Sequence, residues 1–196
     1  NHLSLHVNDN HLGMKFSFDN HSDPENRGEI IMTSECSRNE TGPEFDLKLM
    51  PTSIYLNSKE WTFQPSTVNI RSNEIEVPAF ALTSGDEQIR VNGRISQTQK
   101  DTLTLSLDRF DISIIDSALE ESLGIRGAAT GKVQLTSPMK DKGILADIIC
   151  DSTSIADVSL GELYLGSQWN DEDNTFIISA HNSLNGKSNL DFKGTI

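Results

Sequence analysis

Apolar and polar residues alternate strictly in two neighbouring stretches of the chain, residues 89–95 and 102–108. The apolar positions are Ile89, Val91 and Ile95 in the first stretch, where Gly93 takes the remaining slot, and Leu103, Leu105 and Leu107 in the second. A period of two places all apolar side chains on one face of a strand and all polar ones on the other. This pattern is typical of antiparallel sheets with one dry face and one face in water.

The same alternation recurs less regularly along the rest of the chain. Residues 2–18 carry it on both sides of a polar sequence at 8–10, which predicts a hairpin. We expect a short strand at Glu29–Thr33 between polar loops at 20–28 and 34–43. Further alternating positions are Val133, Leu135, Leu163 and Leu165, whereas Leu145–Cys150 is more continuously apolar and predicts a strand covered on both sides. Short strands at this spacing predict an all-β, antiparallel protein.

One segment departs from the β pattern. Ile115, Ala118, Leu119 and Leu123 are spaced as on one face of a helix. Ser113 and Asp116 stand three residues apart at its start, where their side chains can accept hydrogen bonds from free backbone N–H groups. Gly124 suits the left-handed conformation that ends many helices. We therefore expect a short helix at 114–123.

Composition narrows the functional classes. Only 35% of the 196 residues are hydrophobic, which suits a thin sheet with one apolar face better than a thick core. The net charge of −13 argues against nucleic-acid binding, which needs a basic patch. No apolar run is long enough to span a membrane. The chain begins at Asn1 with neither an initiator Met nor a leader, so we expect it to be a piece of a longer protein.

Several motifs approach known chemistry without meeting its requirements. Residues 124–132 resemble a phosphate-binding loop, but the glycine spacing is one residue short, Val133 replaces the magnesium-binding hydroxyl, and a strand is predicted to follow. We expect this stretch to form a helix exit and a tight turn instead. His2 and His6 share a strand face but lie roughly 13 Å apart, too far to share a metal ion. The acidic turn at 171–173 lacks the ligand spacing of an EF-hand. We expect no nucleotide, metal or other cofactor and no catalysis.

Two pairs of residues leave alternatives open. Trp61 and Trp169 could stack on sugars, although packing within the sheet is the simpler interpretation for residues among strand positions. Cys150 follows two isoleucines, where a buried free thiol is the favoured interpretation, and a bridge between Cys36 and Cys150 is the alternative that the sequence leaves open.

Taken in order, a series of short motifs resembles the TamB/AsmA-like superfamily over residues 61–196. The motifs are Trp61-Thr-Phe, Ser84-Gly-Asp-Glu-Gln88, Val91-Asn-Gly-Arg-Ile95, the alternating Leu103–Leu107, the short helix, Ile125-Arg-Gly-Ala-Ala-Thr-Gly131, Val133-Gln-Leu135, Ile155-Ala-Asp-Val-Ser-Leu-Gly-Glu-Leu163 and Trp169-Asn-Asp171. Residues 1–60 match only as generic β structure. The resemblance therefore divides the chain into a β-rich segment at 1–60 and a TamB-like β region at 61–196.

The resemblance implies an elongated, curved sheet forming an open apolar groove, within an envelope protein anchored in the inner membrane and reaching across the periplasm. It implies phospholipid transport or assistance in outer-membrane assembly, with phospholipid acyl chains and an outer-membrane assembly protein as partners. Candidate groove residues are Ile89, Val91, Ile95, Leu103, Leu105, Leu107, Val133, Leu135, Leu163 and Leu165. The alternative is a compact β-sandwich that binds a glycan or a protein, because a sandwich also has one dry face per sheet.

Overall fold

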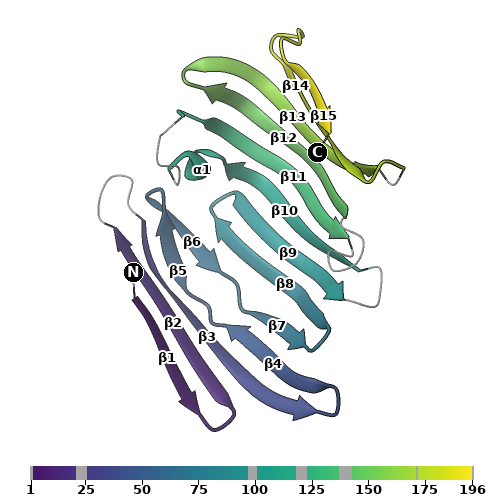
Figure 1. Cartoon of the computed structure of the whole chain (residues 1–196). Coiled ribbons are helices and arrows are strands. Elements are labelled where there is room, and N and C mark those ends of the chain that lie inside the picture. The colour runs from purple at the N-terminus through teal and green to yellow at the C-terminus, as the bar shows by residue number, and fades with distance from the viewer. Residues whose placement is uncertain are drawn as a thin grey trace. The chain divides into compact units, whose positions relative to one another are not determined.

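The computed structural model describes residues 2–20, 26–96, 101–117, 123–136, 143–170 and 172–195, and these form strands with one short helix (Figure 1). The elements are β1 (His2–Asn8), β2 (His11–Asn20), β3 (Asn26–Asn39), β4 (Gly42–Leu49), β5 (Ser53–Leu56), β6 (Lys59–Phe63), β7 (Ser66–Arg71), β8 (Glu74–Ser84), β9 (Glu87–Ser96), β10 (Thr102–Asp111), α1 (Ser113–Ser117), β11 (Arg126–Thr136), β12 (Gly143–Ile155), β13 (Val158–Asn170), β14 (Thr175–Ser183) and β15 (Asp191–Thr195). No helix in the described ranges has the length and apolar character needed to cross a membrane.

The strands are hydrogen-bonded in the order β1-β2-β3-β4-β7-β8-β9-β10-β11-β12-β13-β14-β15. The β5–β6 hairpin lies off this path, with β5 paired to β3 and β6 paired to β8. Neighbouring strands pair antiparallel from β1 to β8 and from β11 to β15. The prediction of an all-β antiparallel protein with many strands and one short helix is confirmed.

The chain divides into two compact units. Unit 1 contains residues 1–85 and 90–103, and unit 2 contains residues 86–89 and 104–196. The division therefore passes through β9 and β10, and it differs from the division at residue 60 that the resemblance implies. β6 itself runs across residue 60.

In unit 1 the predicted hairpin at 2–18 is present as β1 and β2, with Leu5 opposite Met14. The loop predicted at 34–43 is wrong, because β3 continues to Asn39 and β4 begins at Gly42. Cys36 pairs with Phe45 in this stretch, and Asn39 Oδ1 accepts hydrogen bonds from the N–H groups of Thr41 and Gly42. Polar residues on the wet face of the two strands made this hairpin resemble a loop in the sequence.

Five apolar residues described in unit 1 are buried, and all but Val77 lie on or directly beside the β5–β6 hairpin. They are Ile54, Trp61, Phe63, Val77 and Leu82. Trp61 lies opposite Ile54, and Phe63 lies opposite Leu82 and meets Phe80 edge-to-face with ring centroids 5.9 Å apart. The hairpin thus forms a local core within an otherwise thin sheet.

Two chain segments, residues 49–53 and 62–66, lead into and out of this hairpin, and the backbone pairing between them is interrupted once. The β4–β7 ladder ends with Leu49 opposite Ser66, and the β5–β6 ladder begins with Ser53 opposite Thr62. Between them, Met50 N–H donates to Ile31 O on β3, whereas Gln64 N–H donates to Ala81 O on β8. Phe63 N–H still donates to Thr52 O across the two segments, so the gap lies between this bond and the Leu49–Ser66 pair, where each segment bonds to its own outer neighbour. Pro51 and Pro65 have no N–H with which to close the gap between the segments.

The break also changes which residues face the apolar side. Strand pairing places Leu47 and Leu49 of β4 on the same face as Ile54 of β5, although an odd number of positions separates them. Phe63 and Ser66 likewise share the apolar face although an odd number of positions separates them, and the same holds for Ile75 and Leu82. Pro51, Pro65 and Pro78 lie at the three shifts, as expected where ladder hydrogen bonds are interrupted.

In unit 2 the predicted helix is present as α1, which is described from Ser113 to Ser117. The expected end of this helix falls partly on residues 118–122, outside the described ranges. Asp111 accepts a hydrogen bond from Ser113 N–H, and the Asp116 carboxylate accepts the N–H groups of Leu123 and Gly124. Gly124 has the predicted left-handed conformation, with φ of 66°.

Two expectations for β11 and β12 are corrected. Gly127 and Gly131, read from the sequence as part of a helix exit and tight turn, lie inside β11. At Gly131 an added Cβ would lie 2.7 Å from Ile148 Cα, so glycine here permits close strand approach. The strand predicted to be covered on both sides is β12, where Leu145 and Ile149, which share the face opposite the apolar one, are exposed. One side of this strand therefore faces water.

Candidate functional site

The strand registers assemble one apolar face across β11 to β15 of unit 2. Leu165 lies between Ile148 of β12 and Ala180 of β14, and Ala180 in turn lies opposite Phe192 of β15. Parallel rows contain Val133 opposite Ala146, Leu135 opposite Ile144, Cys150 opposite Leu163, and Trp169 opposite Phe176. Four candidate groove residues, Val133, Leu135, Leu163 and Leu165, are thereby placed on a single face.

The remaining six candidates lie on β9 and β10. Ile89, Val91, Ile95, Leu103, Leu105 and Leu107 are all half-buried. They occupy alternate positions of their strands, as the sequence pattern requires. None of the ten candidates is fully buried, so each retains surface that a ligand can cover.

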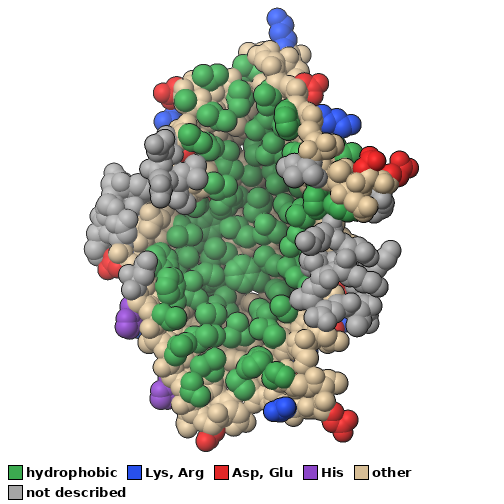
Figure 2. Space-filling view, viewed as in Figure 1, with side chains coloured by type: hydrophobic (Ala, Val, Ile, Leu, Met, Phe, Trp, Pro, Cys, Tyr) green, Lys and Arg blue, Asp and Glu red, His purple; other side chains and the backbone are tan. Residues whose placement is uncertain are grey.

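Unit 1 carries an apolar face of its own, which sequence reasoning left out of the candidate site. Its rows join Leu5, Met14, Met32 and Leu49 across β1 to β4, and Leu47 with Val68 across β4 and β7. Apolar side chains gather over these strands (Figure 2). The signal for this face was present, since residues 2–18 and 45–49 also alternate between apolar and polar side chains.

Large apolar side chains on both units remain open to water. Leu3, Leu5 and Val7 are 58%, 61% and 69% exposed on β1, and Phe192 is 53% exposed on β15. The described strands belong to one hydrogen-bonded sheet, so no second sheet covers these side chains among the described residues. A sheet with one apolar face normally buries that face against another layer or a ligand.

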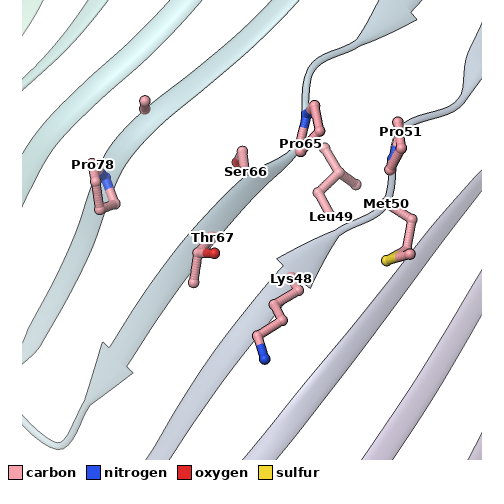
Figure 3. A pocket seen from close by; sticks show the side chains of 9 residues that line it. Lys48, Leu49, Met50, Pro51, Pro65, Ser66, Thr67 and Pro78 are labelled. Carbon is pink, nitrogen blue, oxygen red and sulfur yellow. The ribbon is translucent and has the colours of Figure 1, made fainter.

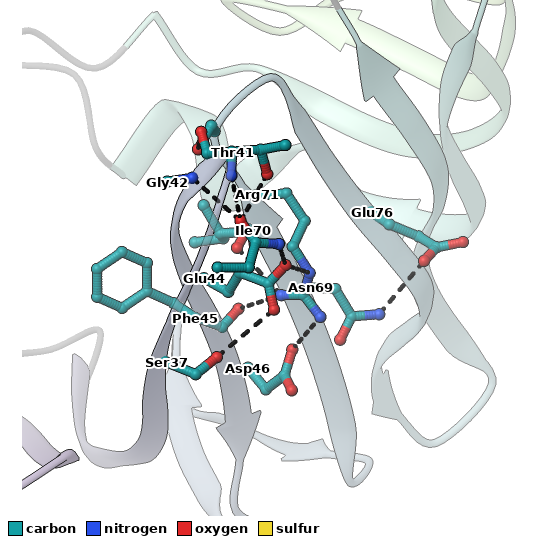
Figure 4. Close-up of polar contacts among 12 residues, drawn as sticks. Ser37, Thr41, Gly42, Glu44, Phe45, Asp46, Asn69, Ile70, Arg71 and Glu76 are labelled. Atoms are coloured by element: carbon teal, nitrogen blue, oxygen red, sulfur yellow. Dashed lines mark hydrogen bonds and ion pairs between the residues drawn. The ribbon is translucent and has the colours of Figure 1, made fainter.

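The opposite face of unit 1 is bound together by ion pairs between neighbouring strands (Figure 4). Arg71 Nη2 lies 2.7 Å from Asp46 Oδ1, and Arg71 Nη1 donates to the Phe45 carbonyl oxygen. Lys15 pairs with Glu29 at 2.5 Å, Lys48 with Glu35 at 2.8 Å, and Arg94 with Glu76 at 3.0 Å. The hydrogen bond from Lys48 lowers the pKa of Glu35, and the one from Arg94, followed by Asn69, lowers the pKa of Glu76.

Where the β4–β7 and β5–β6 ladders part, unit 1 has a hollow of about 540 Å³, which we call the proline hollow (Figure 3). Its apolar wall is formed by Leu49, Met50, Pro51, Pro65, Pro78 and Ala79. Its polar lining residues are Lys48, Ser66 and Thr67. Strand alternation places Leu49 and Ser66 on the apolar face and Lys48 and Thr67 on the other, so the hollow borders both faces of the sheet.

The two tryptophans differ in accessibility. Trp61 is fully buried, so the sugar-stacking alternative is wrong for this residue. Trp169 is half-buried and packs edge-to-face on Phe176, with ring centroids 4.7 Å apart.

The cysteines are both free thiols and lie in different units. Burial raises the pKa of the Cys150 thiol.

Within the described ranges, no group of three or more His, Cys, Asp or Glu side chains is arranged to hold a metal ion. His2 and His6 are exposed on β1, while His21 and Asp171 of the acidic turn lie outside those ranges. The site that stands out is therefore a surface: an antiparallel sheet whose apolar side is incompletely covered. Comparisons with protein-family models, with curated proteins and with solved structures find no match for this chain.

Proposed function

We propose that this chain is a non-catalytic, lipid-binding part of a TamB/AsmA-like envelope protein, whose apolar sheet face shelters phospholipid acyl chains. The proposed role is phospholipid transport or outer-membrane assembly, with an outer-membrane assembly protein as a further partner. The proposed location is the periplasm, within a protein anchored in the inner membrane. The family resemblance of residues 61–196 motivates these choices.

One observation carries the proposal: the apolar rows are continuous from strand to strand, yet their side chains are only half-buried. The row from Ile148 through Leu165 and Ala180 to Phe192 is the clearest example. Each methylene group withdrawn from water contributes about 0.8 kcal/mol. A short length of acyl chain on such a row would therefore be held, while its polar head remains in water.

The β-sandwich alternative has less support. It requires two sheets packed face to face, whereas the described strands are joined in one hydrogen-bonded sheet. Its suggested glycan contact at Trp61 is removed by the complete burial of that side chain. The high exposure of β1 apolar residues also differs from the closed core expected of a sandwich.

Site-specific photo-crosslinking in the cell envelope tests the proposed function. A benzoylphenylalanine at Leu165 is placed on the apolar face, and the matched probe at Tyr164 is placed on the other face, because neighbouring strand residues point to opposite sides. Leu165 should capture phospholipid, and Tyr164 should capture little. Equal capture at both positions, or no capture at Leu165 when the probe is incorporated and the protein is folded, would contradict the proposal.

A further inference from the structure

We propose that the proline hollow of unit 1 binds the carbonyl end of a single acyl chain, with the Ser66 hydroxyl donating a hydrogen bond to the carbonyl oxygen. This inference rests on the proposed function and names a specific seat for the lipid. It concerns residues that the sequence pattern did not select. Pockets that hold small ligands are mostly apolar, have volumes of about 300–1,000 Å³ and contain few polar groups. The hollow, at about 540 Å³, fits this description (Figure 3).

Ser66 supplies the observation that points to a ligand. The residue is only 9% exposed, and its Oγ is buried without a hydrogen-bond partner among the described residues. A buried hydroxyl without a partner is costly, because it has lost its hydrogen bonds to water. A carbonyl oxygen brought into the hollow would accept a hydrogen bond from the Ser66 hydroxyl and remove this penalty.

The remaining lining fits the two ends of such a molecule. Met50, Pro51 and Pro65 offer apolar surface without free N–H groups at the prolines, which suits methylene groups next to the carbonyl. Lys48 lies at the hollow with a half-exposed side chain whose ammonium group contacts Glu35. An ammonium group at this position can attract a phosphate or a carboxylate. The ligand class is therefore an ester-linked acyl lipid or a free fatty acid.

Two lipids that differ only in the carbonyl group provide the test. The probes are lauroyl-lysophosphatidylcholine, whose chain is ester-linked, and its ether-linked analogue, titrated calorimetrically below their micelle concentrations. The wild-type chain should bind the ester about five-fold more tightly, which is the typical value of one hydrogen bond. Ser66→Ala should bind both lipids equally. Laurate, used as a third ligand, separates the two sources, since tight binding of laurate assigns the site to free fatty acids.

Ser34 provides a matched control. Its Oγ is also buried without a partner, and strand pairing places it on the apolar face opposite Leu47, but it does not line the hollow. Ser34→Ala should keep the preference for the ester. Equal binding of both lipids by the wild type, or the same loss of preference in Ser34→Ala, would overturn the assignment of Ser66.

Failure of this inference can be separated from failure of the proposed function. If neither lysolipid binds while the Leu165 probe still captures phospholipid, the hollow is not a lipid seat and the proposed function stands. If neither lysolipid binds and the Leu165 probe captures no phospholipid, both proposals fail. Should Ser66→Ala melt well below the wild type, Ala79→Trp fills the hollow from an exposed position. Unchanged lipid affinity in Ala79→Trp would then overturn the inference.

Discussion

Gly28 of β3 lies directly opposite Ile54 of β5, and the absence of a side chain at Gly28 allows Ile54 to pack against the β3 backbone. A Cβ added to Gly28 would lie 2.9 Å from Ile54 Cα and closer still to the Ile54 side chain. Because a backbone atom is among the obstructions, rotation of one side chain cannot relieve the contact. This pair therefore joins the local core around Trp61 to the long strand β3.

Gly28→Ala should destabilise the protein by about 1–3 kcal/mol, the usual range for overpacking a buried contact. Chemical denaturation monitored by circular dichroism measures this loss. Gly13→Ala is the control, since its added Cβ would meet nothing closer than 3.8 Å. A loss in Gly13→Ala as large as that in Gly28→Ala would show that Ile54 is not the cause.

The two tryptophans should respond differently to truncation. Trp61→Ala removes a fully buried side chain and should cost about 3–5 kcal/mol. Trp169→Ala removes a half-buried ring and should cost clearly less. Denaturation midpoints of the two variants test the difference, and the fluorescence of the Trp169→Ala variant should report a water-excluded indole. Equal destabilisation would contradict the assignment of Trp61 to the local core.

The ion pairs on the polar face predict loss of stability in acid. The pKa of Glu35 and that of Glu76 are both lowered in the folded chain. Their stabilisation is fully present above the ordinary glutamate pKa of about 4.3, and it disappears as pH falls through the lowered folded-state values. Melting temperatures measured between pH 6 and pH 3 should therefore decline as the pH falls below about 4.3.

Arg94→Gln should make this decline shallower, because it removes the hydrogen bond that lowers the pKa of Glu76. Arg90→Gln, which changes an exposed arginine on the same strand, is the control and should retain the wild-type decline. An identical decline in Arg94→Gln and the wild type would show that this pair does not contribute.

The thiols should differ in reactivity. Cys150 is 3% exposed and its pKa is raised by burial, so little thiolate is present and access is poor. A chromogenic disulfide reagent at pH 8 should react with Cys36 first and with Cys150 slowly, and unfolding should equalise the rates. Rapid reaction at Cys150 in the folded chain would contradict its burial under the neighbouring strands. Cys36→Ser and Cys150→Ser variants assign the two phases.

The alternation in the sequence was sufficient to predict the sheet, its antiparallel pairing and the shared face of Val133, Leu135, Leu163 and Leu165. It was sufficient because successive side chains of a strand point to opposite faces, so a strand with one apolar face and one face in water alternates apolar and polar residues. The hairpin of β3 and β4 was missed because Ser37, Glu44 and their polar neighbours lie on the wet face and resemble loop residues. Position in a sheet, not residue type alone, decides such segments.

The proline hollow could not be predicted from the sequence. Pro51, Pro65 and Pro78 stand far apart along the chain, and each alone indicates only a turn or an interrupted strand. Their common position depends on the pairing of β4, β7 and β8 and on the outward hydrogen bonds of Met50 and Gln64. The lack of a hydrogen-bond partner for Ser66 Oγ likewise depends on residues that are close in space but distant in sequence, so the local sequence could not predict it.

The one-residue shift at Pro51 makes the chain sensitive to length in a way that ordinary surface loops are not. β3 keeps a single phase of alternation throughout, whereas the segment beside it changes phase between Leu49 and Ile54. Deleting one residue here would rotate every β5 side chain to the other side if pairing with β3 were kept. Ser53 and Tyr55 would then point into the local core and Ile54 would point into water. Insertions or deletions at this break should therefore be tolerated only in steps of two.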